Sequence, residues 1–233
     1  MSEWPRAVLF DFDGVIVNSE PLHFHAFHEV LREENIELTE AEYYAELLGF
    51  DDRGGFKYIF EKRGVPLPPA TFLRVMTRKS QVMRRLIEQR KFSALPGVPL
   101  FIRGLWRHYP LAICSGALRE EIETMLEGIN LRDCFRVIVA AEDVTVGKPD
   151  PSGYLQTVRL ISEQTGKRLT PADCLIVEDS PKVVSSVRQA GFKVLAVTTS
   201  DSADKFPDAN WVVPSLDPEV VRKQLPSLKM MID

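Results

Sequence analysis

The chain has 233 residues, 45% of them hydrophobic, so it can bury a core as one large domain or as one domain carrying an insertion. Its 29 basic and 33 acidic side chains are interspersed and give a formal charge of −4, without the basic stripe that nucleic-acid binding requires. The N-terminal sequence is unlike a secretory signal, and no apolar run reaches membrane-spanning length. We therefore expect a cytoplasmic protein with no nucleic-acid or membrane partner.

Six short apolar runs are bounded by turn signals, and helical patterns separate most of them. The runs are residues 7–10, 111–114, 137–140, 174–177, 194–197 and 211–213. Continuous apolarity, with helices between the runs, is typical of strands that are buried on both faces of a sheet. The sequence thus predicts an α/β fold with a doubly wound, Rossmann-like parallel sheet.

One long segment interrupts this alternation. Residues 19–90 have only helical periodicity, and the turn signal Leu95–Pro96–Gly97 follows them. We expect a helical cap domain at residues 18–92, inserted after the first strand, and a catalytic core made of residues 1–17 and 93–233.

The first predicted strand ends in two acidic residues, Asp11 and Asp13, followed by Gly14. Ligands of open parallel sheets bind at this carboxyl edge, and a glycine permits an unusual backbone turn there. A helix-loop-helix calcium loop also contains Asp-x-Asp, but its third oxygen ligand, glycine spacing and preceding helix are missing here.

A later strand run ends in two more acids, Glu178 and Asp179. If the four acids gather at one edge of the sheet, they repel one another, and a divalent cation with oxygen ligands, such as Mg²⁺, relieves that repulsion. The alternative is that they are solvated loop residues or charges at helix starts, as any single pair could be.

Two further positions suit an anionic substrate. Ser115 and Gly116 follow the run 111–114 and precede a helical pattern, which places a hydroxyl and amides at an anion-binding helix start. A serine there is more often a simple helix cap. Lys148 precedes Pro149, which favours an extended backbone, so its cation could neutralise a phosphoryl group, although a lone loop lysine is ordinarily solvated.

In order and placement, these motifs resemble the haloacid dehalogenase superfamily of phosphatases and phosphomutases, and the resemblance covers essentially the whole chain. It is greatest to the branch with a helical cap after the first motif, which holds beta-phosphoglucomutase and many sugar-phosphate phosphatases. The motifs that carry it are Asp11-Phe-Asp13-Gly-Val, Ser115-Gly116, Gly147-Lys148-Pro149 and Glu178-Asp179-Ser180.

The resemblance implies a role for each motif. Asp11 would be the nucleophile that forms an aspartyl-phosphate, and Asp13 the general acid and base. Ser115 and Lys148 would hold phosphoryl oxygens, and Gly116 and Ala117 would contact the substrate. The Mg²⁺ ligands would be the carboxylates of Asp11, Glu178 and Asp179 and the backbone carbonyl of Asp13.

In the cap, His23, the turn Gly49–Gly54 with its Arg53, and Lys79 correspond by position to substrate-binding features of that branch. Lys79 falls on an apolar helical stripe, so either its stem packs while its ammonium reaches water or it contacts the substrate. Arg53 lies one position away from where the phosphate-binding arginine of the mutase would fall. This offset favours a hydrolase over a mutase.

The sequence therefore predicts a magnesium-dependent phosphatase that hydrolyses a small phosphate monoester, a phosphorylated metabolite such as a sugar phosphate. The alternatives are a beta-phosphoglucomutase-type mutase and, with less support, a catalytically silent binding protein. We expect a monomer or a weak dimer.

Overall fold

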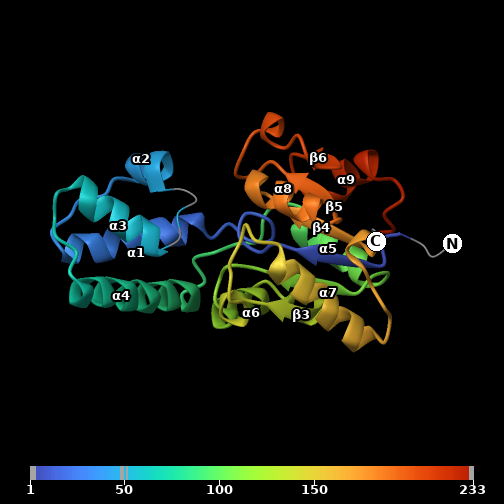
Figure 1. Cartoon of the computed structure of the whole chain (residues 1–233), viewed down its shortest axis with the longest axis horizontal. Helices are drawn as coiled ribbons and strands as arrows, with labels where there is room; N and C mark the ends of the chain where they lie inside the picture. Colours follow the sequence, from blue (N-terminus) through green and yellow to red (C-terminus); the bar gives the residue numbers. More distant parts are fainter. Residues whose placement is uncertain (1–3, 48–49, 51, 231–233) are drawn as a thin grey trace. The chain divides into compact units, whose positions relative to one another are not determined.

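The computed structural model describes residues 4–47, 50 and 52–230. The chain forms two compact units, one made of Met1–Asn18 and Ser93–Asp233 and the other of Ser19–Phe92 (Figure 1). The second unit is thus an insertion between the first strand of the larger unit and the rest of that unit. We call the larger unit the core and the inserted unit the cap.

The core is built on a six-stranded sheet in the order β3-β2-β1-β4-β5-β6, and every adjacent pair is parallel. Its strands are β1 (Ala7–Phe10), β2 (Leu111–Cys114), β3 (Phe135–Val139), β4 (Cys174–Glu178), β5 (Lys193–Val197) and β6 (Trp211–Val213). The predicted doubly wound parallel sheet is confirmed. The third strand begins two residues earlier than predicted, because Phe135 pairs with Leu111 across a register irregularity.

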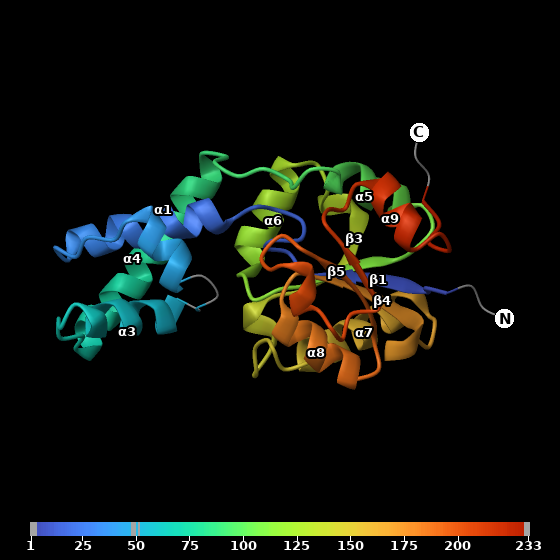
Figure 2. The same ribbon diagram turned by 90° about the horizontal axis from the view of Figure 1, so that it is seen from above.

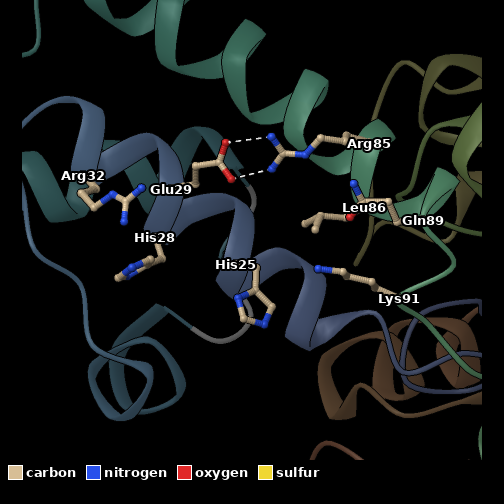
Figure 3. A pocket seen from close by; sticks show the side chains of 8 residues that line it. All are labelled: His25, His28, Glu29, Arg32, Arg85, Leu86, Gln89 and Lys91. Atoms are coloured by element: carbon tan, nitrogen blue, oxygen red, sulfur yellow. Dashed lines mark hydrogen bonds and ion pairs between the residues drawn. The ribbon is translucent and has the colours of Figure 1, made fainter.

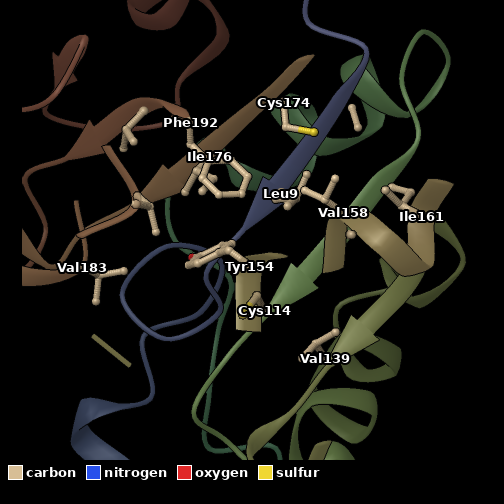
Figure 4. Packing of buried hydrophobic residues seen from close by; sticks show 14 of the residues in the cluster. Leu9, Cys114, Val139, Tyr154, Val158, Ile161, Cys174, Ile176, Val183 and Phe192 are labelled. Carbon is tan, nitrogen blue, oxygen red and sulfur yellow. The ribbon is translucent and has the colours of Figure 1, made fainter. Parts of the chain in front are cut away.

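Helices cover both faces of this sheet (Figure 2). They are α5 (Val98–Trp106), α6 (Arg119–Gly128), α7 (Ser152–Thr165), α8 (Pro181–Gln189) and α9 (Pro218–Gln224). Helices α7 and α8 lie on one face, where Tyr154 and Val183 join a buried cluster with Leu9 and Ile176 (Figure 4). On the opposite face Phe10 meets Phe101 of α5 edge-on, with ring centroids 6.2 Å apart.

The cap is helical, as predicted, and no strand occurs among its described residues. It contains α1 (Glu20–Glu33), α2 (Glu40–Glu42), a π-helical turn (Tyr43–Leu47), α3 (Asp52–Lys62) and α4 (Pro69–Glu88). Helices α1 and α4 pack together and are joined by ion pairs, including Arg78 with Glu29 at 3.0 Å. Capping fixes where α2 begins, because the Thr39 hydroxyl accepts a hydrogen bond from the Glu42 amide at 3.2 Å.

The turn predicted at residues 49–54 is wrong for residues 52–54, because α3 begins at Asp52. Arg53 therefore lies in the first turn of a helix rather than in a loop. Its acidic neighbour Asp52 is the first residue of that helix, where a negative charge is favourable. Gly49 lies outside the described residues.

The chain re-enters the core through Gly97, at the start of α5. Gly97 has φ +82°, and an added Cβ would lie 2.7 Å from the backbone of Asp217. This position therefore requires glycine both for its backbone conformation and for the space around it.

We expect Gly97→Ala to lower the free energy of unfolding by on the order of 3 kcal/mol. Gly64→Ala is the matched control, since Gly64 also has a positive φ, +64°, but nothing within 4 Å of an added Cβ. The control should cost about 1 kcal/mol from backbone strain alone. Chemical denaturation measures both, and equal losses would contradict the close approach to Asp217.

Candidate active site

The carboxyl ends of β1 and β4 bring the predicted acids to one edge of the sheet. Phe10 pairs with Val177, so the next residues, Asp11 and Glu178, leave the sheet at the same level. The Asp11 amide continues the ladder by donating to the Val177 carbonyl at 2.9 Å. The strand order changes direction around β1, the position where open α/β sheets bind ligands.

Asp11, Glu178 and Asp179 form a cluster in which one carboxylate oxygen from each lies within 4.8 Å of the others. The side chains are nearly removed from water, with Glu178 0%, Asp179 6% and Asp11 9% exposed. Three buried carboxylates repel one another, and oxygen donors at this spacing suit a hard divalent cation. The residues therefore fit a metal site.

Lys148 contributes a positive charge to this cluster. Its Nζ lies 2.6 Å from Asp11 Oδ1 and 2.7 Å from Glu178 Oε1, and it donates to the Tyr154 hydroxyl at 3.1 Å. Burial alone would lower the pKa of Lys148, but the two carboxylates outweigh it and raise that pKa. Lys148 thus stays charged and is held by a buried tyrosine that the sequence analysis had not identified.

The single positive charge of Lys148 does not balance the three carboxylates. Burial raises the pKa of Asp11 well above its usual range; Lys148 opposes this shift, and Glu178 and Asp179 add to it. Burial and then the charge of Glu178 raise the pKa of Asp179 to about 7. Burial and the repulsion among three carboxylates, which face only one lysine, explain both increases in pKa.

A tight turn after β1 depends on Gly14, as the sequence analysis predicted. Gly14 has φ +74°, and a Cβ there would lie 2.1 Å from Asp179 Oδ2. The loop after β5 supports this arrangement, because the Thr199 hydroxyl donates to the Gly14 carbonyl at 2.5 Å and the Ser200 hydroxyl donates to Asp179. Thr199 and Ser200 had not been predicted, although they too follow a strand at this edge.

Ser115 leaves β2 at the same edge, but it is not the cap of the following helix. The N-cap position of α6 is Leu118, and the Ser115 hydroxyl instead accepts a hydrogen bond from the Ala117 amide at 3.0 Å. Gly116 between them has open space where a Cβ would stand. Ser115, Gly116 and Ala117 therefore form a short loop with small side chains beside the sheet edge.

Asp13 lies within the turn that follows β1, and its side chain is partly exposed. Its charge acts on Asp179 and raises the pKa of that carboxyl further. The carboxylate of Asp13 is not among the three that form the metal-type cluster. This fits the expectation that Asp13 offers its backbone to a metal and keeps its side chain for proton transfer, which stays a prediction.

Within the cap, two predicted residues are in contact. The Lys79 Nζ donates to His23 Nδ1 at 3.0 Å and pairs with Asp52 Oδ1 at 2.5 Å, and it lies 4.6 Å from the centre of the Phe27 ring. The Lys79 side chain is 0% exposed, so the interpretation that its ammonium reaches water is wrong. Asp52 is the partner that makes this burial tolerable. Arg53 is exposed on α3.

An open α/β fold with buried carboxylates and a lysine at the carboxyl edge of its sheet is suited to metal-assisted chemistry on an anionic substrate. The chain belongs to the haloacid dehalogenase-like hydrolase family, whose sequence model matches residues 8–197. The resemblance inferred from the sequence is thereby confirmed, as is the hydrolase class.

Individual relatives span most of the chain. Protein CbbY from Rhodobacter capsulatus is 29% identical over 91% of this chain and 93% of its own length. A phosphorylated carbohydrates phosphatase from Thermotoga maritima is 27% identical over 81% of this chain and 82% of its own length. The crystal structure of beta-phosphoglucomutase from Clostridium difficile shares the fold, with a TM-score of 0.74 at 20% identity over 94% of this chain and 96% of that chain.

Ser200→Ala should weaken metal binding, because it removes the hydroxyl that positions Asp179. We expect the Mg²⁺ concentration for half-maximal activity to rise about tenfold. Ser202→Ala is the control, since its hydroxyl bonds the exposed Asp204. An equal Mg²⁺ requirement in both variants would contradict the positioning role of Ser200.

His23 should make stability depend on pH. Burial and then the Lys79 charge lower the pKa of His23 from 6.5 to about 3. Below pH 6.5 the unfolded state therefore binds a proton that the folded state does not. The free energy of unfolding should fall by about 1 to 2 kcal/mol from this residue as the pH drops from 7 to 5.

Unfolding by urea at pH 7 and pH 5 measures this contribution. His23→Gln should flatten the pH dependence relative to the wild type, whereas His108→Gln, at an exposed position in the core, should leave it unchanged. If the His23 variant kept the full pH dependence, the assignment of a neutral buried imidazole would be wrong.

Proposed function

We propose that the protein is a Mg²⁺-dependent phosphatase that hydrolyses a small phosphorylated metabolite, a sugar phosphate, through an aspartyl-phosphate on Asp11. One observation carries the proposal: the Asp11 carboxylate lies in a buried cluster with Glu178 and Asp179 and is bonded to Lys148 at 2.6 Å. This arrangement joins a nucleophile, oxygen ligands for a cation, and an ammonium for a phosphoryl group.

In the proposed first step, an oxygen of Asp11 attacks the phosphorus atom and the ester P–O bond breaks. Asp13 donates its proton to the departing alkoxide, so the alcohol leaves neutral. In the second step Asp13 takes a proton from water, whose oxygen attacks the phosphorus atom. The aspartyl P–O bond then breaks, which regenerates Asp11 and releases phosphate.

The other residues would position the phosphoryl group and balance its charge in both steps. Lys148 fixes one oxygen of Asp11 and offers positive charge to the phosphoryl oxygens, while Ser115, Gly116 and Ala117 would bind those oxygens from the end of β2. Mg²⁺ would be held by Asp11, Glu178, Asp179 and the Asp13 carbonyl, and when bound it would neutralise charge on the phosphoryl group.

The sugar-phosphate class has separate support. A relative from Thermotoga maritima that is 27% identical along 81% of this chain is named for phosphorylated carbohydrates. Substrate selection would then depend on the cap, where we propose that His23, Arg53 and Lys79 contact the sugar, together with Gly49. Because Lys79 is already bound to Asp52 and His23, it would act as part of that group rather than as a lone cation.

A panel of phosphorylated metabolites assayed with Mg²⁺ tests the reaction. We expect release of inorganic phosphate from sugar phosphates and loss of that release when EDTA removes the metal. Primer-dependent conversion of glucose 1-phosphate into its isomer, without phosphate release, would instead identify a mutase. No turnover of any compound would indicate a binding protein.

Asp11→Asn should lower the rate of phosphate release about a thousandfold or more, because the amide cannot act as the nucleophile. The side-chain volume barely changes, so the variant should remain folded, which circular dichroism can verify. Asp208→Asn, at an exposed position on the core, should keep full activity. Substantial turnover by the Asp11 variant would mean that another group attacks the phosphate.

A further inference from the structure

The cap contains a second group of polar side chains, around a pocket of about 410 Å³ (Figure 3). This volume is within the range of small-molecule sites. The pocket lies between α1 and the C-terminal end of α4. Its lining residues are His25, His28, Glu29, Arg32, Arg85, Leu86, Gln89 and Lys91.

The pocket is separate from the His23–Lys79 pair. The α1 residues that line it are spaced i, i+3, i+4 and i+7 from His25, so they share one face of the helix. At 3.6 residues per turn, His23 and Phe27, which meet Lys79, project from the opposite face of α1. The group proposed to bind substrate therefore has no member in this pocket.

The one acid of the pocket is already neutralised. Glu29 receives hydrogen bonds from Arg85 at 3.2 and 2.5 Å (Figure 3). Arg78 also pairs with Glu29, at 3.0 Å. The hydrogen bond from Arg85 lowers the pKa of Glu29, so this carboxylate stays ionised and engaged. Arg32, Arg85 and Lys91 against Glu29 give the lining two excess positive charges, with the histidines left out of the count.

Several donors of the lining are uncommitted. Within the described part of the chain, the side chains of Arg32, Gln89 and Lys91 form no hydrogen bond or ion pair, although the charge of Arg32 contributes to lowering the pKa of Glu29. In Figure 3 the side chains of Lys91 and Arg85 extend toward α1, across the space that the pocket occupies. Buried Leu86 contributes an apolar part to the wall.

We propose that this pocket binds a small oxyanion with two or more negative charges, of the chemistry shared by phosphate monoesters, sulfate and polycarboxylates. Arg32 and Lys91 would supply charge-assisted hydrogen bonds, and the Gln89 amide a neutral one. The two excess positive charges of the lining favour a dianion over a monoanion. The site is independent of the proposed hydrolysis, because none of its residues belongs to the cluster at the sheet edge.

A ligand at this site would connect two segments of the cap. His25 lies in the second turn of α1, shortly after the cap begins at Ser19, and Lys91 immediately precedes its last residue, Phe92. An anion bound by Lys91 and by Arg32, in the last turn of α1, would link that helix to the segment after α4.

Histidine ring NMR tests the proposal at the level of single residues, because the chain has only four histidines. Sulfate is the probe, titrated at constant ionic strength against sodium chloride. We expect the His25 and His28 ring signals to shift along a saturable curve, while that of His108 in the core stays still. Acetate, a monoanion, should produce no saturable shift. A response of His23 alone would report a different site and would contradict the proposal.

Substitutions of the lining residues provide a second test of the proposal. Arg32→Gln combined with Lys91→Gln should weaken sulfate binding at least tenfold, whereas Lys57→Gln, an exposed cap lysine outside the pocket, should leave it unchanged. Equal affinity in the double variant and the wild type would overturn the proposal. Comparison of glycerol 3-phosphate with citrate then shows whether the pocket prefers a phosphate monoester or a polycarboxylate.

Discussion

Three carboxylates, from Asp11, Glu178 and Asp179, meet at one nearly dehydrated edge of the sheet, where Lys148 supplies one positive charge. The pKa values of Asp11 and Asp179 are raised as a result. Such a group is costly to bury unless a cation neutralises it, so the arrangement fits a metal site better than a purely stabilising role. The chemistry proposed for Asp11 depends on that cation, because positive charge beside the carboxylate favours its ionised, nucleophilic form.

The surrounding structure keeps this strained group in place. The parallel pairing of β1 and β4 fixes Asp11 and Glu178 at one level, and the left-handed turn at Gly14 leaves room for the Asp179 carboxylate. Hydroxyl groups from outside the motifs complete the arrangement: Tyr154 bonds Glu178 at 3.1 Å and Ser200 bonds Asp179. In the cap, the positive charge of buried Lys79 is likewise paired with the carboxylate of Asp52.

The fold and the acidic cluster could be predicted from sequence because both depend on local patterns and one general rule. Continuous apolar runs mark the strands, and acids that directly follow parallel strands meet at one edge. The roles of Tyr154 and Asp52 could not be predicted in this way. Each depends on a pairing between distant segments, and locally Tyr154 reads as a core residue of α7 and Asp52 as a turn residue. Ser200 could have been found by extending the strand-end rule to β5.

Anomalous diffraction from a crystal soaked in Mn²⁺, as a substitute for Mg²⁺, tests the central claim most directly. We expect a peak bounded by Asp11, Glu178 and Asp179, with Mn–O distances of about 2.2 Å, slightly longer than those of Mg²⁺. An empty cluster at a saturating Mn²⁺ concentration, with the three acids unchanged, would contradict it.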